Sequence, residues 1–272
     1  MKNISIKIFL FVIFIFGIFS CQNQVVKLKQ QRYEEKCFLV PADTAKGSLN
    51  VKVEVEYPSA FTSAAVLDSI RRTLLFNMFG EQYVNVPFDS VAQIYVQNAT
   101  SDYKKESLED LRRFEQMEPN FQLGEYQQSI EGFALFNDAH LFVYGYTRYE
   151  YSGGAHGSNY TFYFNFDLTN GRWLGENDIF VNEYQQPLVE LIKNTILEAN
   201  KLPTLDNSYY LIDSIKPNGN FYISDEGITY LFNIYEIAPY YVGQTEVFLP
   251  YSKLKGIIRK DSPVSYLVAS AK

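Results

Sequence analysis

Histidine is almost absent from this sequence, and His140 and His156 are the only two. A catalytic zinc site needs three protein ligands close together. Both histidines with Asp138 or Glu150 would reach that number, but no spacing typical of metal ligands joins them. The sequence therefore predicts no metal site.

The motifs of several large enzyme families are also missing. There is no G-x-S-x-G nucleophile motif, no Walker A loop and no dinucleotide-binding glycine motif. Cys37 has no Cys-x-x-Cys partner and no neighbouring histidine, so we expect an inert thiol. The chain shows neither internal repeats nor coiled-coil heptads. We therefore expect no cofactor and no redox chemistry.

The longest hydrophobic run is too short for a membrane span. It extends from Ile8 to Phe19 with one interrupting glycine, whereas a spanning helix needs about 20 apolar residues. Lys2 and Lys7 precede the run, and Ser20-Cys21 follows it. A basic segment, an apolar segment and a small residue before the cleavage point are typical of a secretory signal peptide. The cysteine directly after Ser20 indicates a bacterial lipoprotein signal.

Lipidation of Cys21 would determine where the mature protein is located in the cell. Residues 1–20 would be removed, and several acyl chains on Cys21 would give stable membrane anchoring. Cys37 would then be the only thiol, so no disulfide could form within one chain. Gln22 is not the aspartate associated with inner-membrane retention in some bacteria, so we expect an envelope protein anchored to the outer membrane.

Positive charge is in deficit. The chain has 24 Lys and Arg against 31 Asp and Glu, and removal of residues 1–20 leaves 22 basic residues. Nucleic-acid binding rests on neutralisation of phosphates by Lys and Arg, so we expect no nucleic-acid partner. The acidity favours a cationic partner, although mild acidity also serves solubility.

The first part of the mature chain is expected to be a tether. Residues 21–47 are polar, mixed in charge and without clear periodicity. The alternative is a short strand at Phe38-Leu39-Val40, which would bury Cys37. From Leu49 to Tyr57 apolar and polar residues alternate, which predicts a half-buried strand.

Three helices are predicted next. Apolar residues every four positions predict a helix that ends near Gly80. Pro87 and Asp89 can open a second helix, and a third, highly charged helix ends before Pro119. We interpret the charges of the third helix as a solvated face.

Aromatic residues dominate the centre of the chain. Twelve of the 34 residues from Phe133 to Phe166 are Phe or Tyr, and period-two alternation from Phe121 to Asp167 predicts three or four antiparallel strands. They turn at Asn137-Asp138 and at a glycine-rich loop, residues 151–158. In the last strand one face is expected to pack and the other to face outward. The packed face holds Tyr160, Phe162, Phe164 and Phe166, and the outer face Thr161, Tyr163, Asn165 and Asp167.

The remaining chain mixes helices and strands. We predict a helix with Pro187 in its first turn, a hairpin over residues 221–232 and a strand over residues 246–251. A short closing helix over residues 252–258 would have Ser252 as its N-cap. Because strands and helices come in clusters, we expect an α+β fold with antiparallel, aromatic-rich sheets, packed helices and two intimately packed subdomains.

Several separate motifs carry a family resemblance. Residues 151–157, 165–171, 220–227 and 235–252 occur in the order found in the RsiV-type C-terminal domain family, which the region from Phe133 to Ile258 resembles. Residues 49–137 are similar in outline to the N-terminal region of the deacetylase PdaC. The expected domains are a signal peptide (residues 1–20), a tether (21–47), a PdaC-like region (48–137) and an RsiV-like domain (138–260).

The resemblance implies an extracytoplasmic α+β module. Some members are fused to a deacetylase, and RsiV itself is a lysozyme receptor. The sequence lacks a polysaccharide-deacetylase domain and a sigma-factor-binding segment with a spanning helix, so neither activity is expected here. The resemblance instead implies an ectodomain on a lipid anchor.

The glycine-rich loop is the predicted functional site. Glycines supply unusual backbone conformations, and loops on rigid sheets concentrate binding residues. We expect a non-enzymatic binding or sensing role, with lysozyme-like proteins or peptidoglycan as candidate ligands. The alternative is a carbohydrate-active hydrolase that uses Glu150, His156 and Asp167, whereas a bracing role for His156 would need no ligand. The candidate ligand-binding residues are Glu150, Tyr151, Gly153, Gly154, His156, Gly157 and Asp167.

Overall fold

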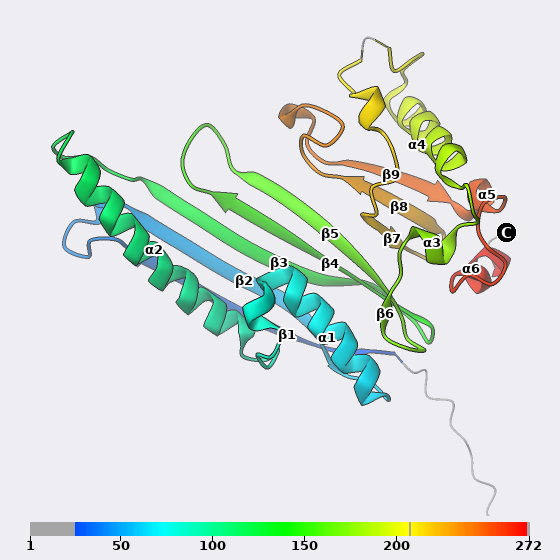
Figure 1. Ribbon diagram of the computed structural model, residues 1–272, viewed down its shortest axis with the longest axis horizontal. Coiled ribbons are helices and arrows are strands. Elements are labelled where there is room, and N and C mark those ends of the chain that lie inside the picture. Colours follow the sequence, from blue (N-terminus) through cyan, green and yellow to red (C-terminus); the bar gives the residue numbers. More distant parts are fainter. Residues whose placement is uncertain (1–24, 207, 271–272) are drawn as a thin grey trace, which may run out of the picture.

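The computed structural model describes residues 25–206 and 208–270. The expected signal peptide and the lipidation site, Cys21, lie outside the described residues. The described chain is α+β, with two sheets, packed helices and aromatic clusters, which confirms the predicted fold class (Figure 1). The strands are β1 (Lys27–Phe38), β2 (Ser48–Ala60), β3 (Glu125–Asn137), β4 (Leu141–Tyr151), β5 (Ser158–Asp167), β6 (Arg172–Trp173), β7 (Phe221–Ile223), β8 (Gly227–Phe232) and β9 (Thr245–Pro250). The α-helices are α1 (Ala64–Phe79), α2 (Val91–Glu115), α3 (Glu176–Ile179), α4 (Gln185–Asn200), α5 (Tyr251–Leu254) and α6 (Ser265–Ser270).

The larger sheet has six strands in sequence order, β1-β2-β3-β4-β5-β6. All neighbours are antiparallel except β2 and β3, which are parallel. The parallel pair follows from connectivity, because α1 and α2 lie between these two strands in the chain and form the crossover that parallel strands need.

The tether prediction is wrong for residues 27–38, which form the edge strand β1. Six charged side chains in this segment obscure the alternation of apolar and polar residues that predicts a strand. An edge strand can carry such charges along its exposed face. They form ion pairs there, such as Lys36 with Glu125 at 3.1 Å. Cys37 pairs with Leu49 in the sheet and is 4 % exposed, so the thiol is buried as the alternative predicted. The strand itself ends at Phe38 and does not include Leu39 and Val40.

One face of the larger sheet packs against α1 and α2 (Figure 1). This face includes Val51, Val53 and Val55 of β2, which are at most 1 % exposed. The second and third predicted helices are one helix, α2. Its polar midsection contains Thr100, whose hydroxyl donates to the Val96 carbonyl at 3.0 Å within the helix.

The smaller sheet has the order β7-β8-β9 and shares a second core with α3, α4 and the C-terminal helices. The predicted hairpin over residues 221–232 is β7–β8, and Pro187 lies in the first turn of α4 as expected. The closing helix is shorter than predicted. It begins at Tyr251 after Pro250, so Ser252 lies inside the helix and is not its N-cap.

The two faces of β5 differ from the prediction. Thr161, Tyr163 and Asn165 are at most 6 % exposed, whereas Tyr160 and Phe162 are each 37 % exposed. The reason is that the C-terminal part of the chain covers the face expected to look outward, and α1 and α2 leave part of the aromatic face open. Asn165 makes this contact directly, because its amide donates to the Phe221 carbonyl at 2.8 Å and accepts from the Ile223 N–H at 2.9 Å.

The predicted boundary between residues 137 and 138 falls inside the larger sheet. β3 ends at Asn137, and its hairpin partner β4 begins three residues beyond the boundary. The two cores also meet at β4, because Phe142 and Tyr144 belong to the first core and Leu141 and Val143 to the second. The sheet therefore unites the two predicted regions.

Candidate functional site

The glycine-rich loop connects β4 and β5 and projects beyond the sheet (Figure 1). Gly153 and Gly154 have φ values of 95° and 91°, a conformation that favours glycine. The Tyr151 hydroxyl donates to the Gly154 carbonyl at 3.1 Å. Gly157 is buried, and a Cβ there would lie 2.5 Å from the Tyr149 hydroxyl. The loop therefore has a backbone shape that needs its glycines.

His156 is held against the C-terminal half of the chain. Its ring stacks on Tyr240, with centroids 3.6 Å apart and planes 15° from parallel. The Tyr240 hydroxyl donates to the Gly157 carbonyl at 3.0 Å, and His156 Nδ1 lies 3.2 Å from the same oxygen. These contacts fit the bracing role for His156, while its outer side remains exposed.

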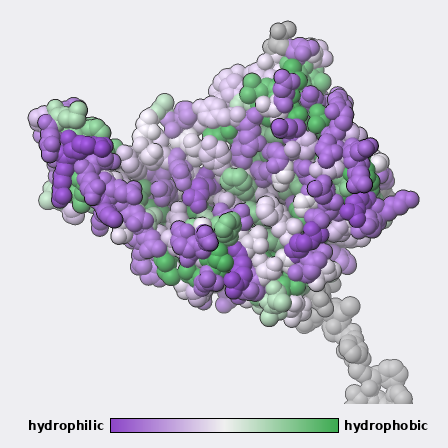
Figure 2. All heavy atoms as spheres, viewed as in Figure 1, coloured by the Kyte–Doolittle hydropathy of each residue, from purple (hydrophilic) through white to green (hydrophobic). Residues whose placement is uncertain are grey.

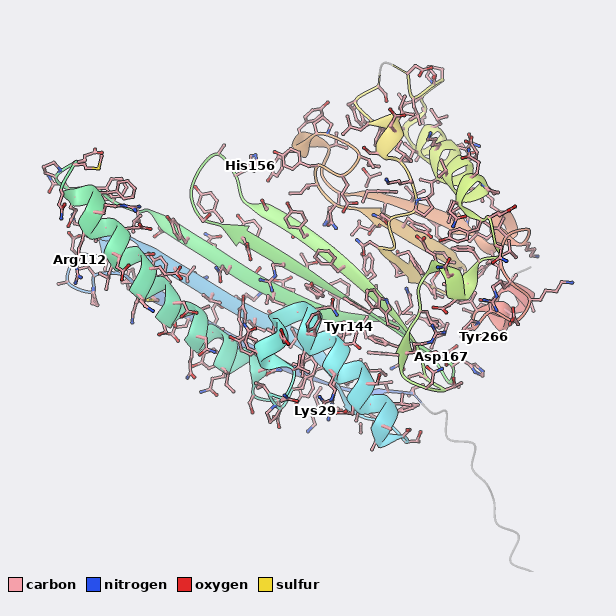
Figure 3. The ribbon with its side chains drawn as sticks, in the orientation of Figure 1. Lys29, Arg112, Tyr144, His156, Asp167 and Tyr266 are labelled. Carbon is pink, nitrogen blue, oxygen red and sulfur yellow. The ribbon has the colours of Figure 1, made fainter. Side chains whose placement is uncertain are left out.

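The three groups of the hydrolase hypothesis do not come together. His156 and Asp167 lie at opposite ends of the β4–β5 hairpin (Figure 3). The nine-residue step along β5 corresponds to roughly 30 Å. Asp167 accepts from the Thr169 N–H at 2.8 Å and so fixes the turn before β6. Glu150 pairs with Arg148 at 3.2 Å.

A cavity of about 540 Å³ lies between the larger sheet and the segments around the smaller one. This volume is typical of small-molecule sites. Its lining comes from α1, β4, β5, β6 and the loops beside β7 and β8. The lining residues are Asn77, Tyr146, Phe162, Tyr163, Phe164, Trp173, Leu174, Gly175, Asn218, Gly219, Asn220 and Glu236.

One wall of the cavity is a continuous series of aromatic rings. Tyr146 lies 5.3 Å from Phe162 and 6.0 Å from Phe164, and Phe164 lies 5.0 Å from Trp173, measured between centroids. Trp173 is 44 % exposed. On the face drawn in Figure 2, hydrophobic residues form small patches among hydrophilic ones. Phe162, which is 37 % exposed, and Trp173 bring the aromatic wall within reach of solvent.

Polar groups complete the cavity. The Asn218 amide donates to Glu236 at 2.9 Å, and the Asn220 side chain bridges Tyr163 N–H and the Thr161 carbonyl. Asn77 lies near the end of α1, where its carbonyl accepts from the Tyr146 hydroxyl at 2.8 Å. Amide side chains can both donate to and accept from hydroxyl groups, and an ionised carboxylate accepts from them. The cavity thus joins stacking surfaces with hydrogen-bonding groups.

Sequence reasoning missed this cavity. Its residues are drawn from positions 77 to 236, which no local pattern connects. The alternation predicts that Phe162 lies on the packed face of its strand, whereas Phe162 lines the cavity and is 37 % exposed. The one available signal is Trp173, the only tryptophan, in a two-residue strand too short to bury it.

Two further properties concern the described residues as a set. No group of three His, Cys, Asp or Glu side chains in them is placed to hold a metal ion. No helix among them has the length and apolarity to cross a membrane.

Comparison with known sequences adds two similarities. Residues 177–252 match the family model described as "Protein of unknown function (DUF3298)". The peptidoglycan-N-acetylmuramic acid deacetylase PdaC of Bacillus subtilis is 29% identical over 120 residues, which are 42% of this chain. The match covers 26% of that deacetylase, so the chain spans about a quarter of its length.

Two solved structures are similar in fold to this chain. A DUF3298 family member from Bacteroides fragilis is 27% identical, with a TM-score of 0.84 over 92% of this chain and 100% of that one. A DUF3298 family protein from Pseudomonas aeruginosa PAO1, 17% identical, has a TM-score of 0.58 over 87% of this chain and 95% of its own. The chain therefore has the fold of the Bacteroides DUF3298 protein and carries a DUF3298 match in its C-terminal half.

Proposed function

We propose that this protein is a non-enzymatic, lipid-anchored binding protein of the bacterial cell envelope that recognises cell-wall glycan in the aromatic cavity. The observation that carries the proposal is the series of rings from Phe162 to Trp173 opposite Asn218 and Glu236.

Glycan recognition requires both parts of this cavity. The apolar face of a sugar ring can stack on an aromatic side chain, which presents a flat apolar surface. The hydroxyl groups at the ring edge then need amide or carboxylate partners, because a polar group buried without a hydrogen bond costs free energy. Asn218 and Glu236 lie on the cavity lining with their polar groups already joined, and such preorganisation lowers the cost of binding.

The cell-envelope assignment is supported by the N-terminal sequence and by one relative. Residues 1–20 and Cys21 form the lipoprotein signal described above. The similar deacetylase is named for a peptidoglycan sugar. Mass spectrometry of membrane-extracted protein is expected to find an acylated Cys21 at the N-terminus, and an intact segment 1–20 would contradict the anchor. We place the anchor in the outer membrane on the basis of Gln22.

The placement of the polar groups supports the proposal of binding without catalysis. Asp167 is separated from Glu150 and His156 by the length of β5 and is used in a turn, and Glu150 is paired with Arg148. Incubation of the protein with peptidoglycan fragments should therefore leave them intact by chromatography, whereas new glycan ends would support the hydrolase alternative.

Trp173 provides a direct binding test, because it is the only tryptophan and lines the cavity. Titration of the soluble domain, residues 22–272, with peptidoglycan fragments should change the Trp173 fluorescence in a saturable manner. Phe162→Ala should weaken binding roughly tenfold, because the loss of a stacking partner costs about 1.4 kcal/mol of binding free energy. Tyr160→Ala is the matched control, since Tyr160 lies on the same strand, is equally exposed and lies outside the cavity. Equal affinities for the two variants would place binding elsewhere.

The glycine-rich loop supports a second candidate function, recognition of a cationic lysozyme-like protein. The supporting observation is that the loop projects from the sheet with exposed residues, among them His156 and Gly154. An acidic protein attracts a cationic partner at low salt. Lysozyme binding by the soluble domain, weakened by His156→Ala and Gly154→Val at equal folded fraction, would support it. No binding at low salt would exclude this partner.

A further inference from the structure

The cavity has an unbalanced charge. Among the residues that the structure describes, Glu236 is the one charged residue in the cavity lining, and no lysine, arginine or histidine lines it. Glu236 accepts a hydrogen bond from Asn218, and none of its contacts within residues 25–206 and 208–270 is an ion pair. Because an unpaired carboxylate beside a partly enclosed cavity attracts positive charge, this side chain favours a cationic group on the ligand.

Two more carboxylates lie directly behind the cavity wall. Glu176 accepts from the backbone N–H of Gly219 at 3.0 Å, and Glu246 accepts from the Tyr163 hydroxyl at 3.4 Å. Gly219 and Tyr163 both line the cavity. Glu176 and Glu246 are held by neutral donors, and in the described part of the chain neither forms an ion pair. Their charges therefore add to that of Glu236.

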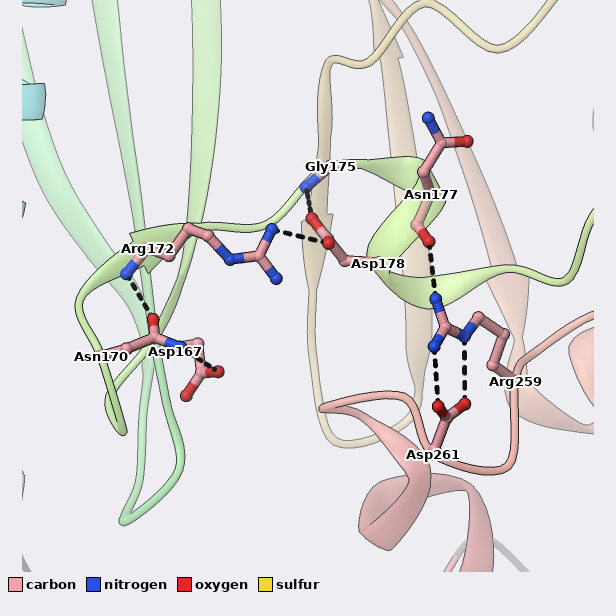
Figure 4. Close-up of polar contacts among 8 residues, drawn as sticks. All are labelled: Asp167, Asn170, Arg172, Gly175, Asn177, Asp178, Arg259 and Asp261. Carbon is pink, nitrogen blue, oxygen red and sulfur yellow. Dashed lines mark hydrogen bonds and ion pairs between the residues drawn. The ribbon is translucent and has the colours of Figure 1, made fainter.

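The nearest basic residue in the sequence does not offset these charges. Arg172 precedes Trp173, but its guanidinium binds Asp178 at 2.7 Å (Figure 4). Asp178 in turn accepts from the Gly175 N–H at 2.8 Å, so the pair is fixed at the start of α3. Arg172 is thus engaged with its own carboxylate beside the cavity.

The aromatic wall favours the same kind of ligand. The faces of aromatic rings attract cations, and tryptophan does so most strongly. Trp173, Phe164 and Phe162 present such rings in the cavity that holds Glu236. A sugar stacked on these rings would therefore gain from an ammonium group within reach of the carboxylate.

We infer that the cavity selects saccharides that carry free amino groups, such as unacetylated glucosamine units, over their N-acetylated counterparts. This inference rests on the proposed glycan-binding function. Glu236 is the specificity-determining residue, and the aromatic wall supplies affinity that both kinds of sugar share. The acetyl group removes the positive charge of the nitrogen, so acetylated sugars would retain only the stacking contribution.

The test compares two oligosaccharides of equal length that differ in the N-acetylation of their sugars, and binding is measured by Trp173 fluorescence and calorimetry. The glucosamine tetramer should bind at least fivefold more tightly than the N-acetylglucosamine tetramer at mildly acidic pH and low salt. Glu236→Gln should remove most of this preference while leaving the affinity for the acetylated tetramer nearly unchanged. Glu226→Gln is the matched control, because Glu226 is exposed in the β7–β8 turn and lies outside the cavity lining. Added salt should reduce the preference, since screening weakens charge attraction.

The outcomes separate this inference from the proposed function. Equal or tighter binding of the acetylated tetramer would overturn the amino-sugar preference and leave glycan binding in place. Loss of binding for both tetramers and for peptidoglycan fragments would overturn both. A lysine oligopeptide that displaces the glucosamine tetramer and binds more tightly would identify the cavity as a site for basic peptides and overturn the inference. An unchanged preference in Glu236→Gln would show that this carboxylate does not determine specificity.

Discussion

Asn233 hydrogen-bonds both backbone groups of Thr161. Its Oδ1 accepts from the Thr161 N–H at 2.8 Å, and its Nδ2 donates to the Thr161 carbonyl at 3.0 Å. The side chain therefore takes the place of a neighbouring strand along the edge of β5, where β6 pairs only with residues 166 and 167. Gln244 also donates to Asn233 Oδ1 at 2.8 Å and connects the same point to the chain before β9. These amides join the two sheets.

The first prediction tests this connection. Asn233→Ala would leave two buried backbone groups of Thr161 with fewer partners, at a cost of about 2–4 kcal/mol. The melting temperature should fall by roughly 5–15 °C for a domain of this size. Asn159→Ala, at an exposed position of the same strand, is the control and should change it little. A small effect of Asn233→Ala would mean that water satisfies these groups.

Asn165 shows why the sequence predicts the positions of the strands better than it predicts which face of each strand is buried. Alternation located β4, β5 and their loop, because period-two patterning is a local property. It assigned Asn165 to the solvent side, since asparagine is usually exposed. In the structure Asn165 is fully buried and bonds to β7, a strand 56 residues away. That partner is a consequence of tertiary packing, which no local pattern contains.

The candidate site was predictable only in part for a similar reason. The conformation of Gly153 and Gly154 follows from residue type, and the loop was located correctly. Asp167 was grouped with this loop because it ends the next strand, and the antiparallel geometry instead carries it to the far end. Glu236 belongs to one of the motifs that carry the family resemblance, but nothing near it in the sequence indicates that it shares a cavity with Trp173.

The second prediction concerns the close contact of Gly157 with Tyr149. A Cβ on residue 157 would lie 2.5–2.6 Å from the Tyr149 hydroxyl and ring. Gly157→Ala should therefore destabilise the fold by about 1–3 kcal/mol, the usual cost of overpacking. Thermal unfolding of the double variant Gly157→Ala with Tyr149→Ala should show a non-additive recovery, because residues in contact couple. Additive losses would contradict a contact between these residues.

The control for this prediction is Gly154→Ala. At Gly154 no atom lies within 4 Å of the added Cβ, so only the positive φ opposes the substitution. The cost should be about 1–2 kcal/mol, and Tyr149→Ala should not reduce it.

The third prediction follows from the burial of Cys37 in β1. Burial raises the pKa of its thiol, so the thiolate that reacts with alkylating reagents is scarce. The folded protein should react with iodoacetamide far more slowly than the unfolded chain, as followed by mass spectrometry. Labelling at equal rates in both states would mean that β1 detaches readily from the sheet.

Substitution of the same residue measures what β1 contributes. Cys37→Ser would bury a hydroxyl group in an apolar site, at a cost of about 1–3 kcal/mol, and should lower the melting temperature by several degrees. Lys36→Ser, at the exposed neighbouring position, is the control. An unchanged melting temperature in Cys37→Ser would return residues 27–38 to the role of a tether.

The fourth prediction is a loss of stability at alkaline pH. Burial, and then the hydrogen bond to Glu176, raise the pKa of Tyr184 from about 10 to about 12. Between these pH values the unfolded chain has lost the phenolic proton while the folded protein still holds it. The unfolded state then binds fewer protons, so the free energy of unfolding falls as pH rises from about 10 to about 12. Below pH 10 this contribution is fully present.

Several other buried tyrosines shift in the same direction, among them Tyr144, Tyr230 and Tyr251, and burial is the leading cause for each. Urea unfolding followed at a series of pH values should therefore show a decline in stability that begins near pH 10 and steepens above it. Tyr184→Phe removes one of these titrating groups, so its decline with pH should be shallower than that of the unaltered protein. Tyr241→Phe, at a position that is 75 % exposed, is the matched control and should keep the original slope. If Tyr184→Phe and Tyr241→Phe showed the same slope, Tyr184 would titrate alike in the folded and unfolded states.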